Sequence, residues 1–304
     1  MKKSFLKENK IFKINLFYVL SLIPIVIFAY YKNGIVPAKH GSIPFWFGTQ
    51  YIVIPIIVLI LSYVFEVYYY TVIKKEEGLS SVYNSIAPFV NVLCYLVTAP
   101  MYKLYITIPV MIVVDVALKF IDNKVTINQV ALYKCIIFGI FMLMGVKGYA
   151  NYYEVNLEEV VTKPSLLFLG MGKGAIGVTS TLCALIGYLI LMFNKYYKKE
   201  MPIIAFLGYA IVACVLYFVG KIGFYDILRN LFNSGFIFAI VYVLSLSNAT
   251  PVVRTGRALY AFFAGLICGI LVNVNHLYIG VYITILIGSL LVPVFNKFKF
   301  TVGK

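Results

Sequence analysis

Long apolar runs are the feature that most restricts how this chain folds. Of its 304 residues, 62% are hydrophobic and 12% are charged, and this charged fraction is about half that of an ordinary soluble domain. Many of the runs extend over about 17–22 residues, which is the length that a helix needs to cross the hydrocarbon core of a bilayer. The sequence therefore predicts an all-α polytopic membrane protein.

Polar residues, glycines and prolines separate the apolar runs. We expect about ten transmembrane helices, near residues 12–31, 50–70, 84–99, 103–120, 131–146, 175–194, 202–220, 232–247, 257–273 and 277–295. With the N-terminus inside, 18 of the 26 lysines and arginines fall in cytoplasmic segments and 8 in outer segments. Because positive residues accumulate in cytoplasmic loops, this distribution favours a multi-pass protein with both termini in the cytoplasm.

A short pattern recurs at half the chain length. Asn84-Ser85 opens a span that closes at Ala99-Pro100, and Asn233-Ser234 opens one that closes at Thr250-Pro251. With five spans in each half, the two halves have opposite orientations, as in many transport folds with inverted repeats. We therefore expect a first five-helix half at 1–146, an outer loop at 147–173 and a second five-helix half at 174–304.

The net charge of +15 does not indicate nucleic-acid binding, because the basic residues lie in short segments between the spans, where membrane topology places them. The five cysteines fall inside apolar spans without a C-x-x-C pattern, as expected of small buried hydrophobic residues. We predict no disulfide framework, no metal site and no catalytic residue, since no nucleophile, base or carboxylate pair has a suitable spacing.

The segment 171–180 contains the pattern G-x-G-x-x-G, from Gly172 to Gly177. In a dinucleotide-binding fold, such a turn follows a strand and opens a helix within a βαβ unit. Here a membrane-length helix follows and no parallel sheet is expected, which argues against a Rossmann site. Two interpretations stay open. In the first, the N–H groups of the helix start bind an anion, and Thr179 and Ser180 cap the helix or donate to the ligand. In the second, the glycines form a tight loop with close helix packing.

Ionisable residues inside the spans are a second candidate feature. Asp115 and Lys119 lie four residues apart on one face of the fourth span, and Glu66 lies late in the second. Intramembrane charges often mark ion or proton paths. The alternative interpretation is a local ion pair whose lysine reaches the cytoplasmic surface.

Several segments resemble, in the same order, one family of membrane proteins: the B subunit of the sodium-translocating NADH:quinone reductase and the D subunit of the Rnf electron-transport complex. The matching segments are residues 12–16 with Leu22-Ile23-Pro24, residues 83–100, Asn128 within Ile127-Asn128-Gln129-Val130, residues 174–180, and Ala249-Thr250-Pro251 with Gly256-Arg257. The resemblance covers most of the chain.

The resemblance implies ten helices in two inverted halves, flavin binding, and electron transfer coupled to ion movement. It also implies a multisubunit complex in the cytoplasmic membrane of a bacterium, with membrane and flavoprotein subunits as partners. The cofactor would be FMN or another flavin. The implied cofactor-binding residues are Gly174, Gly177, Thr179, Ser180, Asn84, Ser85, Asn128, Thr250 and Pro251, with Thr162 as a candidate for covalent FMN attachment.

The chain departs from the family pattern at several positions. It lacks the Ser-Gly-Ala-Thr segment that carries the FMN link in many members, and Thr162 stands in the matching loop. Val178 and Leu246 replace two family acids, and Val116 replaces a family lysine. The leading hypothesis is an integral-membrane subunit of a flavin-dependent electron-transport complex that couples electron transfer to ion movement. The alternative is a small-solute transporter or channel on the same fold, without flavin, which the departures favour.

Overall fold

The computed structural model describes residues 10–75, 85–121, 126–146, 163–246 and 249–298, and helices are the only regular secondary structure among them. The first part of the chain forms α2 (Lys10–Tyr30), η1 (Tyr31–Ile35), α3 (Val36–Lys39), α4 (Phe45–Gly48), α5 (Gln50–Tyr68), η2 (Tyr69–Ile73), α7 (Ala87–Leu96), α8 (Leu104–Phe120) and α9 (Gln129–Leu143), where η marks a π-helix. The second part forms α11 (Pro164–Leu169), α12 (Thr181–Met192), α13 (Glu200–Phe218), α14 (Phe224–Asn233), α15 (Phe236–Phe238), η3 (Ala239–Leu244), α16 (Arg254–Asn273), α17 (Gly280–Leu290) and α18 (Val292–Phe295).

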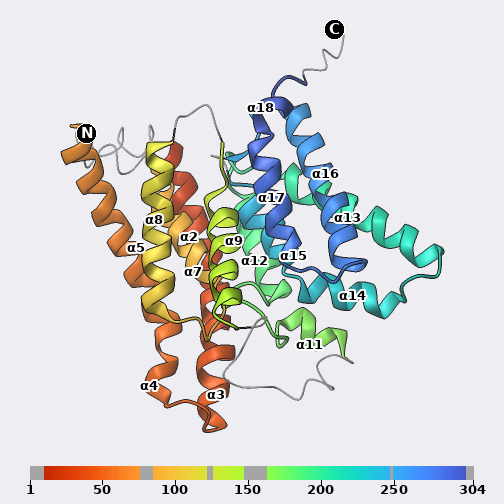
Figure 1. Ribbon diagram of the computed structural model, residues 1–304, viewed down its shortest axis with the longest axis horizontal. Helices are drawn as coiled ribbons and strands as arrows, with labels where there is room; N and C mark the ends of the chain where they lie inside the picture. Colours follow the sequence, from red (N-terminus) through yellow and green to blue (C-terminus); the bar gives the residue numbers. More distant parts are fainter. Residues whose placement is uncertain (1–9, 76–84, 122–125, 147–162, 247–248, 299–304) are drawn as a thin grey trace.

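The helices form one bundle in which the two parts of the chain are packed together (Figure 1). α2 packs against α12, and α9 packs against α17, so segments that are far apart in the sequence lie side by side. α5 and α8 lie on one side of the bundle, and α13 and α16 lie on the other. The short helices α7, α15 and η3 lie between these two sides and contact both the helices before them and those after them.

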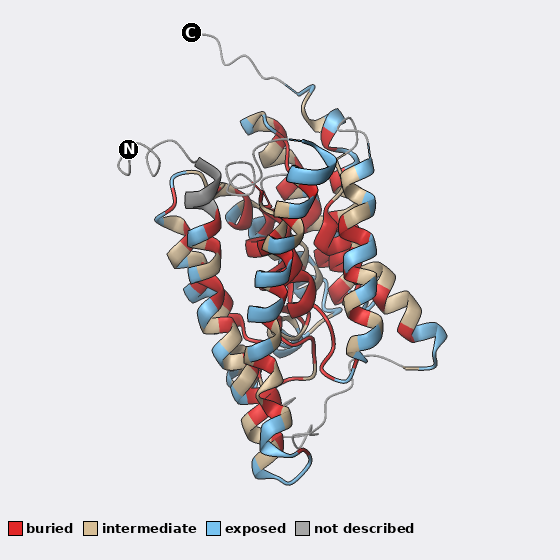
Figure 2. Cartoon of the chain, turned by 90° about the vertical axis from the view of Figure 1, so that its left-hand side faces the viewer, coloured by how far each residue is buried: buried red, intermediate tan, exposed pale blue. Residues whose placement is uncertain are grey.

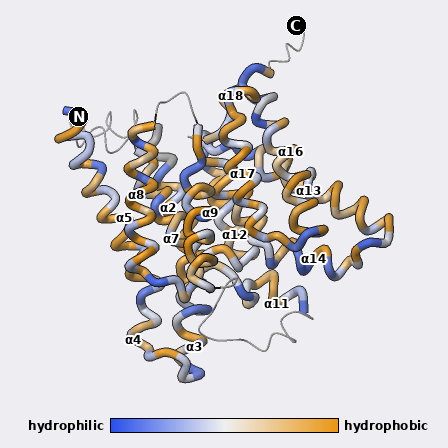
Figure 3. The backbone as a smooth tube through the Cα atoms, viewed as in Figure 1, coloured by the Kyte–Doolittle hydropathy of each residue, from blue (hydrophilic) through white to orange (hydrophobic). Residues whose placement is uncertain are grey.

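Hydrophobic residues predominate along the long helices (Figure 3). Large side chains such as Val64, Leu189 and Phe218 are 61%, 58% and 84% exposed, which indicates a surface covered by lipid. Among the described residues, four stretches are long and apolar enough to cross a membrane, and the bent pair Phe224–Asn233 and Phe236–Leu244 makes a fifth if it is counted as one span. The all-α membrane fold is thus confirmed, whereas the number of ten spans stays a prediction.

Two of the expected spans are shorter than predicted and are buried. The segment predicted at 84–99 contains only the ten residues of α7, every one of which is buried except Ala87. The segment predicted at 232–247 is interrupted at Gly235, whose φ of 68° lies in the left-handed region that glycine adopts readily. All residues of α15 and η3, which follow, are buried. Because other helices surround them (Figure 2), these segments do not need the length of a bilayer.

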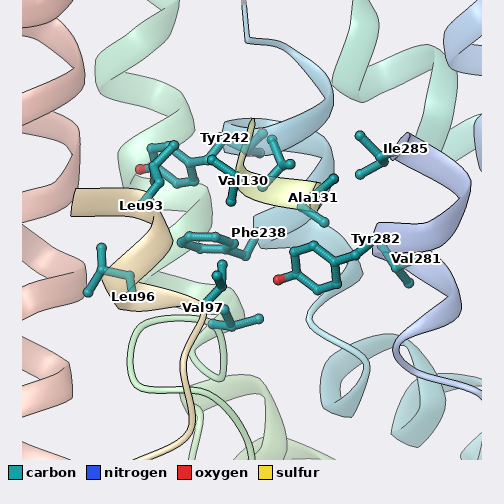
Figure 4. Packing of buried hydrophobic residues seen from close by; sticks show 14 of the residues in the cluster. Leu93, Leu96, Val97, Val130, Ala131, Phe238, Tyr242, Val281, Tyr282 and Ile285 are labelled. Carbon is teal, nitrogen blue, oxygen red and sulfur yellow. The ribbon is translucent and has the colours of Figure 1, made fainter. Parts of the chain in front are cut away.

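Side chains from both parts of the chain interlock around the short helices (Figure 4). Phe238 of α15 and Tyr242 of η3 lie beside residues of α7, and their ring centroids are 5.0 Å apart. The other labelled members of this cluster come from α7, α9 and α17 or lie next to them: Leu93, Leu96, Val97, Val130, Ala131, Val281, Tyr282 and Ile285. The most completely buried part of the molecule is therefore the place where the two parts of the chain meet.

Small residues bring α13 and α16 into close contact. A Cβ on Gly265 would overlap the carbonyl oxygen of Ala205, and one on Gly208 would stand 2.5 Å from the carbonyl oxygen of Phe262. Such approaches of backbone to backbone are typical of helix pairs in membranes, where small residues allow close van der Waals packing.

Candidate functional site

The C-terminal ends of α7 and η3 lie inside the protein, and this position creates a chemical requirement. The last carbonyl groups of a helix have no partner within the helix. A buried carbonyl without a hydrogen bond is costly, above all in a membrane protein, where water is scarce. The donors that satisfy these carbonyls come partly from the residues that the sequence singled out.

Three carbonyls at the end of α7 each receive a donor. The backbone N–H groups of Gly177 and Ile176 donate to the carbonyls of Leu96 and Thr98, both at 2.8 Å. The ammonium group of Lys134, which is fully buried in α9, donates to the carbonyl of Val97 at 2.5 Å. A cation is also favoured at this position because the C-terminal end of a helix carries partial negative charge.

Glycines within and just before the G-x-G-x-x-G segment allow this contact. A Cβ on Gly177 would stand 2.8 Å and 2.9 Å from side-chain atoms of Leu96 and 3.0 Å from Ile25. Gly170, with a φ of 108°, ends α11, and a Cβ there would stand 2.6 Å from the Cα of Ser180. These glycines thus form a tight loop in close contact with other helices, which is one of the two interpretations that the sequence leaves open.

Polar groups hold the two ends of the same segment. Lys32, buried in η1, donates from its ammonium group to the carbonyl of Gly172. At the other end, the Ser180 hydroxyl accepts from the N–H of Cys183 at 3.2 Å and so caps α12.

Two further residues of this segment lie close to its cap. The hydroxyl of Thr179, next to Ser180, is buried and has no hydrogen-bond partner among the described residues. Val178 packs against Gly235, just before α15.

Asn128 satisfies the end of η3 from the first part of the chain. Its amide N–H donates to the carbonyl of Val243 at 2.8 Å, while its side-chain oxygen accepts from the N–H of Ala131 at 3.1 Å and caps α9. Its backbone N–H donates to the hydroxyl of Ser289 in α17 at 3.0 Å. Asn128 therefore caps the start of α9 and also satisfies a carbonyl at the end of η3.

The remaining predicted residues lie away from these two helix ends. The carbonyl of Ser85 accepts from the side chain of Asn15 at 2.7 Å, near the start of α7. Thr250 accepts from the ammonium group of Lys198, and Pro251, beside it, is buried.

The lysine that contacts Thr250 lies between α12 and α13. Burial lowers the pKa of Lys198 to about 8; nearby Arg257 adds to this shift and Glu200 opposes it.

Two of the predicted site residues, Asn84 and Thr162, lie outside the described residues.

The ionisable residues of the spans form one network. Asp115 and Lys119 make the expected pair within α8 at 3.3 Å, and Lys119 also pairs with Glu66 from α5. The amide groups of Gln129 and Asn91 donate to the two oxygens of Asp115 at 3.3 Å and 3.4 Å. The charged groups and Gln129 line a cavity of about 480 Å³ that reaches the start of α7.

Sequence reasoning does not identify two buried lysines as functional candidates. Counting charges places Lys134 in a cytoplasmic segment and Lys32 in an outer one, yet both are buried within helical segments. The signal that identifies Lys134 is its isolation: it is the only charged residue between Gln129 and Leu143. An intramembrane lysine without a carboxylate nearby in the sequence indicates a backbone carbonyl as a partner.

Asn128→Ala tests the double role of this residue. The substitution removes the cap of α9, worth about 1 kcal/mol, and leaves the Val243 carbonyl without its donor, which costs about 1–3 kcal/mol more. Ser180→Ala is the matched control, since it removes only the cap of α12. We expect the melting temperature in detergent to fall clearly further for Asn128→Ala than for Ser180→Ala. Equal decreases would contradict the bond to Val243.

Comparisons with known proteins identify the family of this chain. A model of the NQR2, RnfD, RnfE family matches residues 2–301. The chain is 26% identical over 145 residues to the B subunit of the Na(+)-translocating NADH-quinone reductase of Chlamydia abortus, covering 43% of this chain and 29% of the relative. It is 25% identical over 158 residues to the D subunit of the proton-translocating ferredoxin:NAD(+) oxidoreductase complex of Clostridium ljungdahlii, covering 51% of this chain and 47% of the relative.

The matched region thus spans less than half the length of each of these relatives. The family match, by contrast, extends over every described helix, including the short buried helices and the donors that satisfy them. The chain belongs to the NQR2, RnfD, RnfE family.

Proposed function

We propose that this chain is the integral-membrane subunit of an electron-transport complex of the Nqr and Rnf type, and that the complex depends on flavin and couples electron transfer to ion movement. Family membership over residues 2–301 is the observation that carries the proposal. The names of the relatives describe subunits of sodium- or proton-translocating oxidoreductases. The proposed partners are the other membrane subunits and the flavoprotein subunits of such a complex.

The glycine positions around Gly177 are packed against protein atoms. The positions that glycines leave open are filled by protein atoms, with Leu96 and Ile25 against Gly177 and Thr179 against Gly174. The buried hydroxyl of Thr179 is the one side-chain group of this segment without a hydrogen-bond partner among the described residues. We therefore place the proposed FMN link at Thr162 and derive no step of electron transfer through the glycine segment.

Ion coupling is supported by the charges of the cavity at the start of α7. Glu66 and Asp115 share the ammonium group of Lys119. Both carboxylates are nearly inaccessible, with 1% and 4% of their residue surface exposed. The two buried carboxylates share one partly buried cation, and Lys74, the second lysine that lines the cavity, is exposed. A buried negative charge of this kind favours the uptake of a proton or a monovalent cation. The side-chain amides of Asn91 and Gln129 donate to the two carboxylate oxygens of Asp115 and so fix the orientation of this carboxylate.

A solute transporter is the second candidate. It is favoured by the filled glycine positions and by a second polar cavity, of about 620 Å³, where α13 and α16 end. An inverted-repeat transporter opens to the two sides of the membrane in turn, and polar cavities at opposite ends of the bundle agree with such access. This candidate predicts solute uptake into proteoliposomes without any reductant.

In-gel flavin fluorescence tests the cofactor proposal. We expect the wild-type chain to fluoresce after denaturation, Thr162→Ala to lose the signal, and Thr179→Val to retain it, because only Thr162 is proposed as the covalent link. Co-purified subunits are identified in the same preparation by mass spectrometry. A chain without flavin and without redox-active partners would contradict the proposal.

Asp115→Asn tests ion coupling in the purified complex reconstituted into liposomes. The substitution removes the charge that Lys119, Asn91 and Gln129 hold in place, so we expect reductant-driven ion movement to collapse while electron transfer continues. Glu200→Gln is the control, because Glu200 pairs with Arg257 away from this cavity. Unchanged ion movement in Asp115→Asn would exclude this cluster from the path, and solute uptake without reductant would favour the transporter.

A further inference from the structure

A second polar cavity lies at the opposite end of the bundle from the Glu66 cavity. It has a volume of about 620 Å³ and is formed where the C-terminal ends of α13 and α16 meet α14. Leu216 and Val274 contribute apolar walls, and the ionisable groups of the rim come from four exposed residues: Lys221, Asp226, Arg229 and His276. Because they are exposed, these side chains are available to a ligand.

The charges of this cavity are not balanced among themselves. Neither Lys221 nor Arg229 forms an ion pair with a described residue. A carboxylate oxygen of Asp226 lies 3.2 Å from the position that a Cβ on Gly223 would occupy, so it turns towards the N-terminal end of its own helix, which attracts negative charge. The cavity therefore presents two cations and a net positive charge, whereas Lys119 in the other cavity is paired with two carboxylates.

The floor of the cavity is fixed by hydrogen bonds. The side chain of Asn230 donates to Asn273 at 3.3 Å, and Asn273 donates to the carbonyl of Gly269 at 3.0 Å. The hydroxyl of Tyr209, from α13, donates to Asn273 at 3.4 Å. Asn230 and Asn273 are 3% and 2% exposed. Three helices are thus tied together beneath the charged rim, which keeps the cavity open in one shape.

Exposed aromatic residues are next in sequence to residues that line the cavity. Tyr217 and Phe218 at the end of α13 are 48% and 84% exposed, and Phe224 and Tyr225 at the start of α14 are 58% and 72% exposed. Aromatic side chains of this kind collect at the level of the lipid headgroups. The exposed tyrosines among them, Tyr217 and Tyr225, favour a depth near the lipid phosphates for the two cations of the cavity.

We propose that this cavity binds the phosphate headgroup of an anionic phospholipid, with Lys221 and Arg229 as its charged ligands. Arginine and lysine bind phosphate oxygens through charge-assisted hydrogen bonds, and basic pockets between membrane helices bind lipid headgroups by this chemistry. The imidazole of His276 adds a hydrogen-bonding group at the rim, and Leu216 and Val274 contact the start of the acyl chains. This inference is independent of the electron-transport function.

Native mass spectrometry of the delipidated full chain, with any subunits that remain bound, tests this site. The probes are phosphatidylglycerol and phosphatidylcholine with identical acyl chains. We expect the wild type to prefer phosphatidylglycerol, and the double variant Lys221→Gln/Arg229→Gln to lose roughly 10- to 30-fold in affinity for it. The charge-preserving variant Lys221→Arg/Arg229→Lys should keep the preference.

The control variant is Arg254→Gln/Lys297→Gln, which removes two exposed positive charges outside this cavity and should bind phosphatidylglycerol as the wild type does. Equal binding of the two lipids by the wild type, or equal losses in both double-glutamine variants, would overturn the proposal. Glycerol phosphate is the soluble competitor. Displacement of phosphatidylglycerol by an equimolar amount would assign the cavity to a soluble phosphate and would also overturn it.

Discussion

The carbonyl groups at the ends of two short buried helices are the constraint on which the rest of this structure depends. α7 and η3 end inside the bundle, where their last carbonyls have no water to bind. The structure satisfies them with the N–H groups of Ile176 and Gly177, the ammonium group of Lys134 and the amide of Asn128. The glycine loop and these buried polar residues thus share one role, which is to supply hydrogen-bond donors to the buried carbonyls at the ends of α7 and η3.

Most of these bonds cross between the two parts of the chain, which has a mechanical consequence. Residues after 174 satisfy the end of α7, and Asn128 satisfies the end of η3. Neither part can move away from the other without exposing buried carbonyls, at a cost of several kcal/mol for the group of bonds. The centre is therefore rigid, whereas the polar cavities lie towards opposite ends of the bundle. This arrangement suits a membrane subunit with a fixed centre between two polar cavities.

The sequence predicts the parts of the fold that apolar length and polar breaks specify. The all-α membrane class follows from the runs themselves, and the ion pair of Asp115 with Lys119 follows from their spacing. The capping role of Ser180 follows from its place at a helix start. The resemblance to the family of reductase and Rnf subunits is confirmed by the family match.

Other features depend on contacts between residues that are distant in the sequence. The ion pair of Glu66 with Lys119 cannot be predicted from local sequence, because the two residues are 53 positions apart. The lengths of α7 and η3 are overestimated because an apolar run shows hydrophobicity and does not distinguish a lipid-facing helix from one enclosed by protein.

Hydrogen exchange at the glycine segment tests the central constraint most directly. The measurement is deuterium uptake with residue resolution, by mass spectrometry of the protein in nanodiscs. Ile176 and Gly177 lie outside any helix, but their N–H groups are bonded to the end of α7. The account predicts that both amides exchange as slowly as those within α12. Exchange as fast as at the exposed residues Gly223 and Phe224 would show that the carbonyls of α7 are not satisfied in this way and would contradict the account.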